Sequence, residues 1–368
     1  EDLLRRDPVK INLDEIASYL TGKVVMVTGA GGSIGSELCR QVCAYRPAKI
    51  VLLEYSENNL FDIDNELRGL YADMDIVPDL CDIKDRVKLQ QSFAKHLPQV
   101  VFHAAAHKHV PLMEKNPTEA IKNNILGTRN VAEMADKFNT GTFILISTDK
   151  AVNPTSVMGA SKRIAEMVIQ DYNQKSPTRY AAVRFGNVLG SRGSVVPTFK
   201  KQIENGGPVT VTHPEMTRYF MTIPEAVQLV IQAGALASGG EIFVLDMGEP
   251  VKILDLARDL IHLHGYEPDK DIKITYTGVR PGEKLYEELF SAREQMAATR
   301  HDRIYISQKE TQMAQEVGET VDTLFSKNAF INNTDVIDLI RKILPDFRPK
   351  IAKPELKTDV DFKNRLQN

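Results

Sequence analysis

Short apolar runs alternate with longer amphipathic stretches along the first half of the chain. The runs cover residues 23–29, 49–54, 75–78, 99–104, 142–147 and 179–185. The stretch after the first run has the helical spacing of three and four residues between Ile34, Leu38, Val42 and Tyr45. Continuous apolar strands separated by helices are typical of a parallel sheet with both faces covered. Because crossovers between parallel strands are right-handed, the pattern predicts an α/β fold with a doubly wound parallel sheet.

The rhythm changes after Phe185, where glycine and proline become frequent in 186–197 and 204–209. This composition favours loops, so we expect a smaller, interleaved substrate-binding lobe. Later patterns predict a strand over 241–247, a helix over 253–264 and an amphipathic stretch over 334–344. The predicted organisation is a lead-in at 1–20, a main domain at 21–185 and about 222–246, the smaller lobe at 186–221 and about 247–300, and a C-terminal extension at 301–368.

Charge and cysteine content exclude several classes of function. The 46 basic and 49 acidic residues are well mixed and give a net charge of −3, so we expect no nucleic-acid partner. Three cysteines are too few for a disulfide framework or a zinc site, which favours a reducing, cytoplasmic location. No run reaches the roughly 18 apolar residues that span a bilayer, so we expect no membrane contact within this chain. The charged start at Glu1, without an initiating methionine, favours a fragment of a longer protein.

A glycine-rich turn joins the first predicted strand to the first predicted helix. It places Gly29, Gly32 and Gly35 where glycine permits a tight turn, close approach of a pyrophosphate and close helix–strand packing. Ser33 and Ile34 open the helix, whose N-terminus would face the phosphates. Since the turn follows a strand and begins a helix, the main domain is predicted to be a Rossmann domain that binds a dinucleotide.

Residues at the ends of the second, third and fourth predicted strands complete the predicted cofactor site. Glu54 ends the second strand, 19 residues beyond Gly35, where a carboxylate binds ribose hydroxyls and would repel a 2′-phosphate. NAD is therefore predicted rather than NADP. We expect Asp82 and Ile83, after the third strand, to meet the adenine ring, while Ala104 and Ala105 leave room for the dinucleotide.

Histidines cluster after the fourth strand, at His103, His107 and His109. We predict no metal site, because the sequence singles out no further ligand and no supporting carboxylate. Lys108 and His109 are predicted to contact a substrate, since ligands bind beyond the carboxyl ends of parallel strands.

The fifth strand leads into Ser147, Thr148, Asp149 and Lys150, and a new helix then carries Met158 and Lys162 one turn apart. In short-chain dehydrogenases/reductases the last pair is tyrosine and lysine. Together with the glycine turn, Asp82, residues 103–106, Asn124 and residues 184–188, these features resemble the extended branch of that superfamily over about residues 20–290.

Within that branch, the Asp-Lys pair followed by Met158 and Lys162 is similar to the UDP-N-acetylglucosamine 4,6-dehydratases of the CapD-type polysaccharide biosynthesis family. Residues 103–114, 217–221 and 280–284 support the resemblance. It implies hydride removal from C4 of UDP-N-acetylglucosamine to NAD, loss of water across C5 and C6, and return of the hydride to C6. The product would be a UDP-4-keto-6-deoxy-N-acetylhexosamine for bacterial surface or protein glycans.

The resemblance also assigns catalytic roles. It implies that Asp149 is the acid for the leaving hydroxyl and that Lys150 is the base at C5. Such a base needs a pKa well below the usual value of about 10.4, through desolvation or through the charge of Lys162. Met158 cannot accept the C4 hydroxyl proton, which leaves water, Thr148 or Asp149 as acceptor.

Further contacts follow from the same resemblance. Ser147 would bond the sugar and Lys162 the nicotinamide ribose. The expected nucleotide-sugar contacts, in addition to Lys108 and His109, are Asn124, Asn187, Arg218, Arg280 and Glu283, of which the arginines suit phosphate oxygens.

The resemblance also implies that copies of the chain associate, and two alternative functions stay open. The superfamily implies a homo-oligomer, a dimer or larger, formed through helices near 117–138 and 158–175. Larger family members carry an amino-terminal membrane region, so tethering of a longer protein at the cytoplasmic face of the inner membrane stays open. A nucleotide-sugar 4-epimerase and a non-catalytic dinucleotide-binding protein are the alternatives; the methionine subgroup resembles enzymes that retain the C5 configuration.

Overall fold

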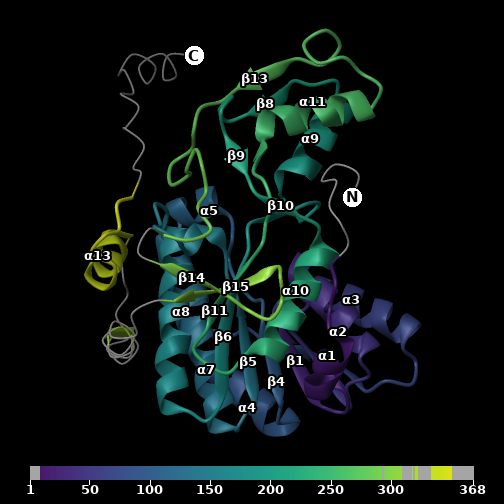
Figure 1. The fold of residues 1–368 in the computed structure, drawn as a ribbon, viewed down its shortest axis with the longest axis vertical. Coiled ribbons are helices and arrows are strands. Elements are labelled where there is room, and N and C mark those ends of the chain that lie inside the picture. The colour runs from purple at the N-terminus through teal and green to yellow at the C-terminus, as the bar shows by residue number, and fades with distance from the viewer. Residues whose placement is uncertain (1–8, 292–293, 309–316, 318–319, 322–332, 350–368) are drawn as a thin grey trace, which may run out of the picture.

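A nine-stranded sheet runs through the larger part of the molecule in the computed structural model, which describes residues 9–291, 294–308, 317, 320–321 and 333–349 (Figure 1). Its strands are β1 (Val24–Thr28), β2 (Lys49–Glu54), β3 (Ile76–Leu80), β4 (Val100–His103), β5 (Thr142–Ile146), β6 (Arg179–Arg184), β11 (Ile242–Leu245), β14 (Gln295–Ala298) and β15 (Ile304–Gln308). The spatial order is β14-β15-β11-β6-β5-β4-β1-β2-β3. All pairs from β11 to β3 are parallel, whereas β15 is antiparallel to both β11 and β14.

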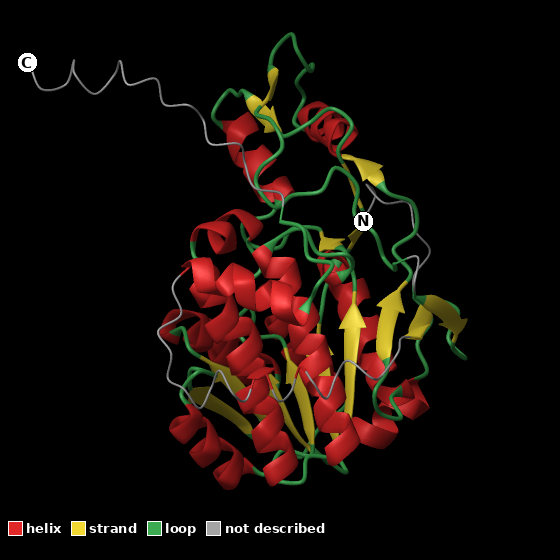
Figure 2. Cartoon of the chain, turned by 90° about the vertical axis from the view of Figure 1, so that its left-hand side faces the viewer, coloured by secondary structure: helices red, strands yellow, loops and turns green. Residues whose placement is uncertain are grey.

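Helices cover both faces of this sheet, as Figure 2 shows. One apolar cluster joins Val25 and Val27 of β1 to α1 (Leu13–Leu20), α2 (Ser33–Ala44), α3 (Glu57–Leu70) and α10 (Ile223–Leu236). A second cluster joins Met26 of the same strand to α4 (Arg86–His96), α7 (Thr128–Lys137) and α8 (Val157–Lys175). Successive side chains of a strand point to opposite faces, so the central strands, which are covered on both faces, must be apolar on both faces. The predicted doubly wound parallel sheet is confirmed.

The helix that carries Met158 and Lys162 is fixed at its start by a side-chain cap. Ser156 accepts a hydrogen bond from the N–H of Gly159 at 3.0 Å, which satisfies one of the free donors of the first turn of α8. A Cβ on Gly159 would lie 2.2 Å from the carbonyl oxygen of Lys150, so the helix start packs directly on the segment after β5. This packing places α8 beside the carboxyl end of the sheet.

The smaller lobe stands above the carboxyl ends of the strands and has its own apolar cluster (Figure 1). It contains β7 (Asn187–Val188), α9 (Val195–Glu204), β8 (Val209–Val211), β9 (Thr217–Arg218), β10 (Phe220–Met221), β12 (Val251–Lys252), α11 (Ile253–Leu263) and β13 (Ile274–Tyr276). The expectation of loop throughout 186–197 is wrong at its end, where α9 begins. Val196, Phe199 and Ile203 are buried at helical spacing, and Pro197 is tolerated in the first turn.

Between β4 and β5 the chain forms α5 (Val110–Lys115), α6 (Pro117–Ala120) and the π-helical turn η1 (Ile121–Gly127), which runs directly into α7. After β5 comes the short 3-10 helix η2 (Asp149–Ala151). A Cβ on Gly127 would lie 2.5 Å from Cδ1 of Ile83, so the glycine at the end of η1 lets this helix pack directly on the loop after β3.

Both ends of the described chain add to the main domain. Ile16 and Leu20 of α1 are fully buried, and Tyr19 donates to the carbonyl of Ile231 at 2.6 Å. The predicted lead-in at 1–20 is therefore partly core, although residues 1–8 lie outside the described residues. The boundary predicted near residue 300 divides the β14–β15 hairpin, which the structure keeps within the main sheet.

The predicted amphipathic stretch at 334–344 forms α13 (Asn333–Ile343), which packs against α6 and α8. The rest of the predicted C-terminal extension lies largely outside the described residues, including 350–368. Across the described part of the chain, no helix is both long and apolar enough to cross a membrane.

Candidate active site

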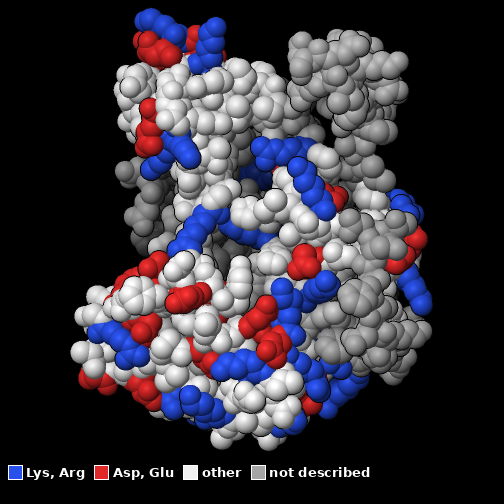
Figure 3. All heavy atoms as spheres, turned by 180° about the vertical axis from the view of Figure 1, so that it is seen from behind, with Lys and Arg blue, Asp and Glu red and all other residues white. Residues whose placement is uncertain are grey.

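A cleft of about 600 Å³ separates the carboxyl ends of the central strands from the smaller lobe. Figure 3 shows lysine and arginine side chains around the hollow between the two parts. Among the described residues, six basic and two acidic side chains line the cleft: Lys108, Lys150, Lys162, Arg218, Arg280 and Lys284 against Glu283 and Glu287. The chain as a whole is slightly acidic, so this local excess of positive charge favours an anionic ligand in the cleft.

The predicted glycine turn forms one end of the cleft. Gly29 has a φ of 67°, and a Cβ there would lie 2.8 Å from the backbone of Ala105. A Cβ on Gly35 would lie 2.0 Å from the carbonyl oxygen of Gly29. Gly32 is the N-cap of α2, and no described side chain caps the first N–H groups of that helix. These N–H groups at the positive end of the helix fit a pyrophosphate.

A second cavity of about 150 Å³ adjoins this turn, and both cavities touch Gly32 and Ala104. Its lining brings together five of the predicted cofactor-binding residues: Glu54, Asp82, Ile83, Ala104 and Ala105. The two adjoining cavities therefore fit an elongated dinucleotide laid across the end of the sheet.

Glu54 is held firmly in this second cavity. One of its oxygens accepts the N–H of Gly31 at 3.0 Å, and the other accepts the N–H groups of Tyr55 and Ser56 at 3.1 and 3.0 Å. Asp82 accepts the N–H of Lys84 at 2.8 Å. Ribose binding by Glu54 and adenine contact by Asp82 stay predictions, supported by the position of both residues in the cavity wall.

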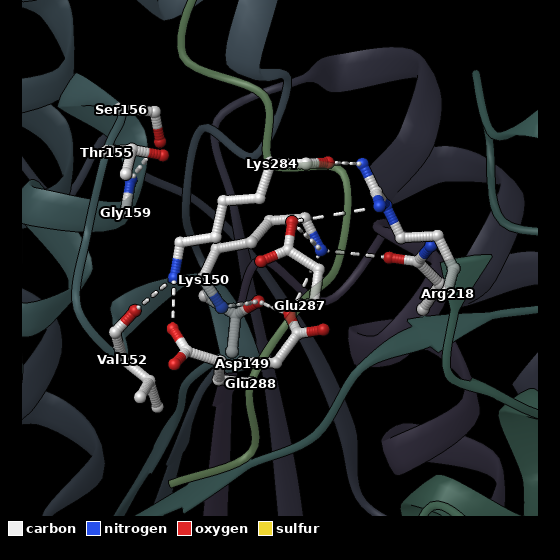
Figure 4. A network of polar contacts seen from close by, with 12 residues as sticks. Asp149, Lys150, Val152, Thr155, Ser156, Gly159, Arg218, Lys284, Glu287 and Glu288 are labelled. Atoms are coloured by element: carbon white, nitrogen blue, oxygen red, sulfur yellow. Dashed lines mark hydrogen bonds and ion pairs between the residues drawn. The ribbon is translucent and has the colours of Figure 1, made fainter. Parts of the chain in front are cut away.

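The predicted acid and base lie together on η2, as Figure 4 shows. Nζ of Lys150 donates to Oδ1 of Asp149 at 3.0 Å and to Oδ1 of Asn187 at 3.0 Å. Thr148 donates to the same Asp149 oxygen at 2.8 Å. Thr148 and Lys150 line the cleft, whereas Asp149 is fully buried behind them. Thr148 therefore links Asp149 to the cleft.

The charge state of Lys150 differs from the expectation. Burial opposes its charge, but the carboxylates of Asp149 and Glu287 outweigh burial and hold the pKa of Lys150 above its ordinary value. The lowered pKa that the base role at C5 requires is therefore not found for Lys150 in this structure. Instead, burial lowers the pKa of Lys162 to about 8, with Glu166 acting in the opposite direction. Nζ of Lys162 donates to the carbonyl of Ile146 at 2.7 Å.

Met158 lines the cleft one turn before Lys162 on α8 and is 2% exposed. It belongs to an apolar cluster that includes Ile164 of the same helix and Ile340 of α13. Its thioether offers only a weak acceptor, so its contribution to the site is shape and exclusion of water.

Two residues predicted to contact the sugar serve the surrounding structure. Ser147 lines the cleft, but its hydroxyl donates to Glu166 at 2.6 Å. Asn124 is fully buried in η1 and bonds the backbone N–H and carbonyl of His107 and the hydroxyl of Ser161. Asn124 therefore positions the loop after β4, and the expectation that it binds substrate is corrected.

The other predicted substrate contacts all reach the cleft: Lys108, His109, Asn187, Arg218, Arg280 and Glu283. Lys108 donates to Ser191 at 3.2 Å, and burial followed by the charge of Lys150 lowers its pKa. The guanidinium of Arg218 already donates hydrogen bonds to the carbonyls of Thr217, Lys284 and Leu285. The side chain of Arg280 is exposed and makes no hydrogen bond or ion pair with another described residue, so it is the freer arginine for a phosphate.

The sequence analysis missed Glu287. Its carboxylate lines the cleft, lies 3.9 Å from Nζ of Lys150 and 4.0 Å from Nε of Arg218, and is 4% exposed. Burial and then Asp149 raise its pKa, although Lys150 and Arg218 act against them. A hint in the sequence was its position in the segment that also carries Arg280 and Glu283. That segment has neither helical nor strand periodicity, so the sequence does not indicate which of its acidic side chains points into the cleft.

The family model of the polysaccharide biosynthesis proteins matches residues 25–309. The chain belongs to the polysaccharide biosynthesis protein family. The probable polysaccharide biosynthesis protein EpsC of Bacillus subtilis (strain 168), a similar relative, is 60% identical over 307 residues, which are 83% of this chain and 51% of EpsC. The chain thus spans about half the length of this relative.

Other relatives of this chain are described as enzymes that act on nucleotide sugars. The UDP-N-acetylglucosamine 4,6-dehydratase (inverting) of Campylobacter jejuni strain 81-176 is 35% identical over 276 residues, 74% of this chain and 78% of that protein. The UDP-glucose 4-epimerase of Rickettsia canadensis (strain McKiel) is 34% identical over 283 residues, 75% and 80% of the two chains. The X-ray structure of Pen from Bacillus thuringiensis has a TM-score of 0.72 and 34% identity, and the match covers 78% of this chain and 88% of Pen.

Proposed function

We propose that this chain catalyses the NAD-dependent 4,6-dehydration of UDP-N-acetylglucosamine to a UDP-4-keto-6-deoxy-N-acetylhexosamine, for bacterial surface or protein glycans. The observation that carries the proposal is the contact of Thr148 and Lys150 with Asp149 at the wall of a positively lined cleft. This arrangement offers two exchangeable protons beside the place where a nucleotide sugar would lie. The relationship to a protein described as a UDP-N-acetylglucosamine 4,6-dehydratase supports the choice of substrate.

The residues of this chain account for the protons of such a reaction. NAD would accept the hydride of C4 and return it to C6. Thr148 would pass the C4 hydroxyl proton to Asp149, to which it is hydrogen-bonded at 2.8 Å, and this replaces the phenolate that Met158 cannot supply. Asp149 would then deliver that proton, again through Thr148, to the C6 hydroxyl as it leaves as water.

Lys150 would take the C5 proton as the C6 hydroxyl departs and would return a proton to C5 when the hydride reaches C6. No proton is gained or lost over the cycle. Lys150 must react as its free amine, and its neighbours favour the ammonium. The rate of elimination should therefore rise with pH as Lys150 loses its proton.

Proton spectra of UDP-N-acetylglucosamine incubated with the protein and NAD in heavy water test the proposal. A 4-keto-6-deoxy sugar with deuterium at C5 is the expected product. A C4 epimer formed without loss of water would instead support the epimerase alternative, for which the 34% identity to the Rickettsia protein is the specific observation.

Two variants test the assigned residues. Asp149→Asn and Lys150→Ala should abolish turnover while the affinity for NAD, measured by calorimetry, stays within about twofold, because neither side chain lines the second cavity, where Glu54 and Asp82 are predicted to bind the adenosine part of NAD. Variants that turn over at the parent rate would refute the mechanism, and NAD binding without any turnover of the parent would support a non-catalytic protein.

A further inference from the structure

The Glu287 carboxylate lines the cleft beside Lys150 and takes no part in the proposed proton transfers. Oε1 of Glu287 lies 3.9 Å from Nζ of Lys150 on one side and 4.0 Å from Nε of Arg218 on the other. Its other oxygen, Oε2, is buried without a hydrogen-bond partner among the described residues. A buried carboxylate that leaves an oxygen unsatisfied is costly, so its retention beside the base suggests a role in the site.

The segment that carries Glu287 is fastened to the site on both sides. Nζ of Lys284 donates to the carbonyl of Val152 at 2.9 Å, two residues after Lys150. Arg218 donates to the carbonyl of Lys284 at 2.8 Å, and Thr155 donates to the carbonyl of Gly282 at 3.1 Å. Figure 4 shows this segment between the strand of Arg218 and the start of η2. These bonds fix the position of the Glu287 carboxylate relative to Lys150.

The charges around Lys150 come from several elements. Asp149 lies on η2, and Glu287 lies on the segment around Lys284 described above. Arg218 lies on β9 and Lys108 on the loop after β4. The positive charge of Lys284 acts on Glu287, and Tyr219 lies near Asp149. When Asp149, Glu287, Lys150 and Arg218 are all ionised, the charges of these four side chains cancel, and Lys108 and Lys284 add positive charge around them. Removing Glu287 would leave two cations facing one carboxylate, which disfavours the ammonium of Lys150.

We propose that Glu287 is a positioning residue that holds the Lys150 ammonium in the cleft of the resting enzyme and so sets the pH range in which Lys150 becomes the base at C5. The catalytic part of this inference rests on the proposed function. The ammonium held in this way is also the form of Lys150 that must return a proton to C5 at the end of the cycle.

The first test measures the charge of Lys150 without any substrate. The rate at which an amine-acylating reagent labels Lys150 is followed by mass spectrometry against pH, for the parent and for Glu287→Gln. Labelling requires the free amine, so its midpoint should move to lower pH by about one unit or more when the carboxylate is removed. Glu288→Gln is the matched control, because Glu288 is the exposed neighbour and contacts Lys284 and Asn153 but not Lys150. Its midpoint should equal that of the parent.

The second test uses turnover. The rising limb of kcat/KM against pH should move to lower pH in Glu287→Gln and stay in place in Glu288→Gln. If Glu287→Gln does not fold, Glu287→Asp keeps the charge at a greater distance and should give a smaller shift in the same direction. A labelling midpoint and a limb that stay at the parent position in the folded variant overturn the inference. A parent that forms no 4-keto sugar, with the labelling shift intact, would overturn only the proposed function.

Discussion

His103 illustrates how a residue that resembles a metal ligand can be structural. At the end of β4, its ring lies 2.6 Å from the hydroxyl of Thr28 and 2.9 Å from that of Thr128. Burial, and then the charge of Lys162, lower the pKa of His103 to about 3. Both ring nitrogens are thus occupied and the ring is neutral, so His103 joins the end of β4 to the end of β1, from which the glycine turn starts.

The neutral ring of His103 should make stability dependent on pH. Unfolded histidine has a pKa of about 6.5, so between pH 6.5 and 3 the unfolded chain binds a proton that the folded chain refuses. The stabilisation is complete above pH 6.5 and is lost as pH falls toward 3, at a cost of about 2 kcal/mol between pH 7 and 5. Urea unfolding at both pH values should show a smaller loss in His103→Gln by about this amount. An equal loss in both proteins would contradict this account.

At the scale of elements, the first turn of α2 packs so closely on the glycine turn before it that Gly35 tolerates no added methyl group. A Cβ there would lie 2.0 Å from the carbonyl oxygen of Gly29, whereas a Cβ on Gly69 in α3 would meet nothing within 4 Å. Gly35→Ala should therefore lower the free energy of unfolding by about 3 kcal/mol and weaken NAD binding at least about tenfold. Gly69→Ala should be neutral or more stable by up to about 1 kcal/mol. Urea unfolding and calorimetry measure both, and equal behaviour of the two variants would refute the packing argument.

The same elements show what sequence can predict and what it cannot. The central parallel strands could be predicted because burial on both faces requires apolar residues on both faces. The glycine turn could be predicted because the spacing of its glycines reflects a steric requirement. The helix α9 was missed because glycines precede and follow it and Pro197 lies in its first turn. The role of Asn124 was misassigned because sequence places a residue near the end of the sheet without showing that its amide is already bonded to His107 and Ser161.

At the scale of the whole molecule, a buried ion cluster joins the main domain to the chain that follows the smaller lobe. Arg184 of β6 is fully buried, pairs with Glu166 of α8 at 2.7 Å and with Glu294, just before β14, at 3.0 Å. Glu166 also accepts the hydroxyl of Ser147 at 2.6 Å. Since unpaired charges are costly inside a protein, this cluster requires the β14–β15 hairpin to be in place for the end of β5 to be ordered.

The C-terminal helix covers part of the surface that resemblance assigns to self-association. Val336 and Ile340 of α13 are fully buried in one cluster with Ile164 and Val168 of α8. Helices near 117–138 and 158–175 were expected to form the contact between copies. A contact through α8 therefore has to include α13 or displace it.

Displacing α13 should thus promote self-association through the apolar face of α8. In Ile340→Asn a polar amide replaces a fully buried side chain, which costs about 3 kcal/mol if α13 stays in place and favours its release. Asp338→Asn is the matched control, because Asp338 is exposed on the same helix with 70% of its side chain accessible. Sedimentation velocity over a range of concentrations should show larger species, and a dye for apolar surface should bind, in Ile340→Asn alone. An unchanged sedimentation coefficient with a lower melting temperature would mean that α13 only adds stability and does not shield an association surface.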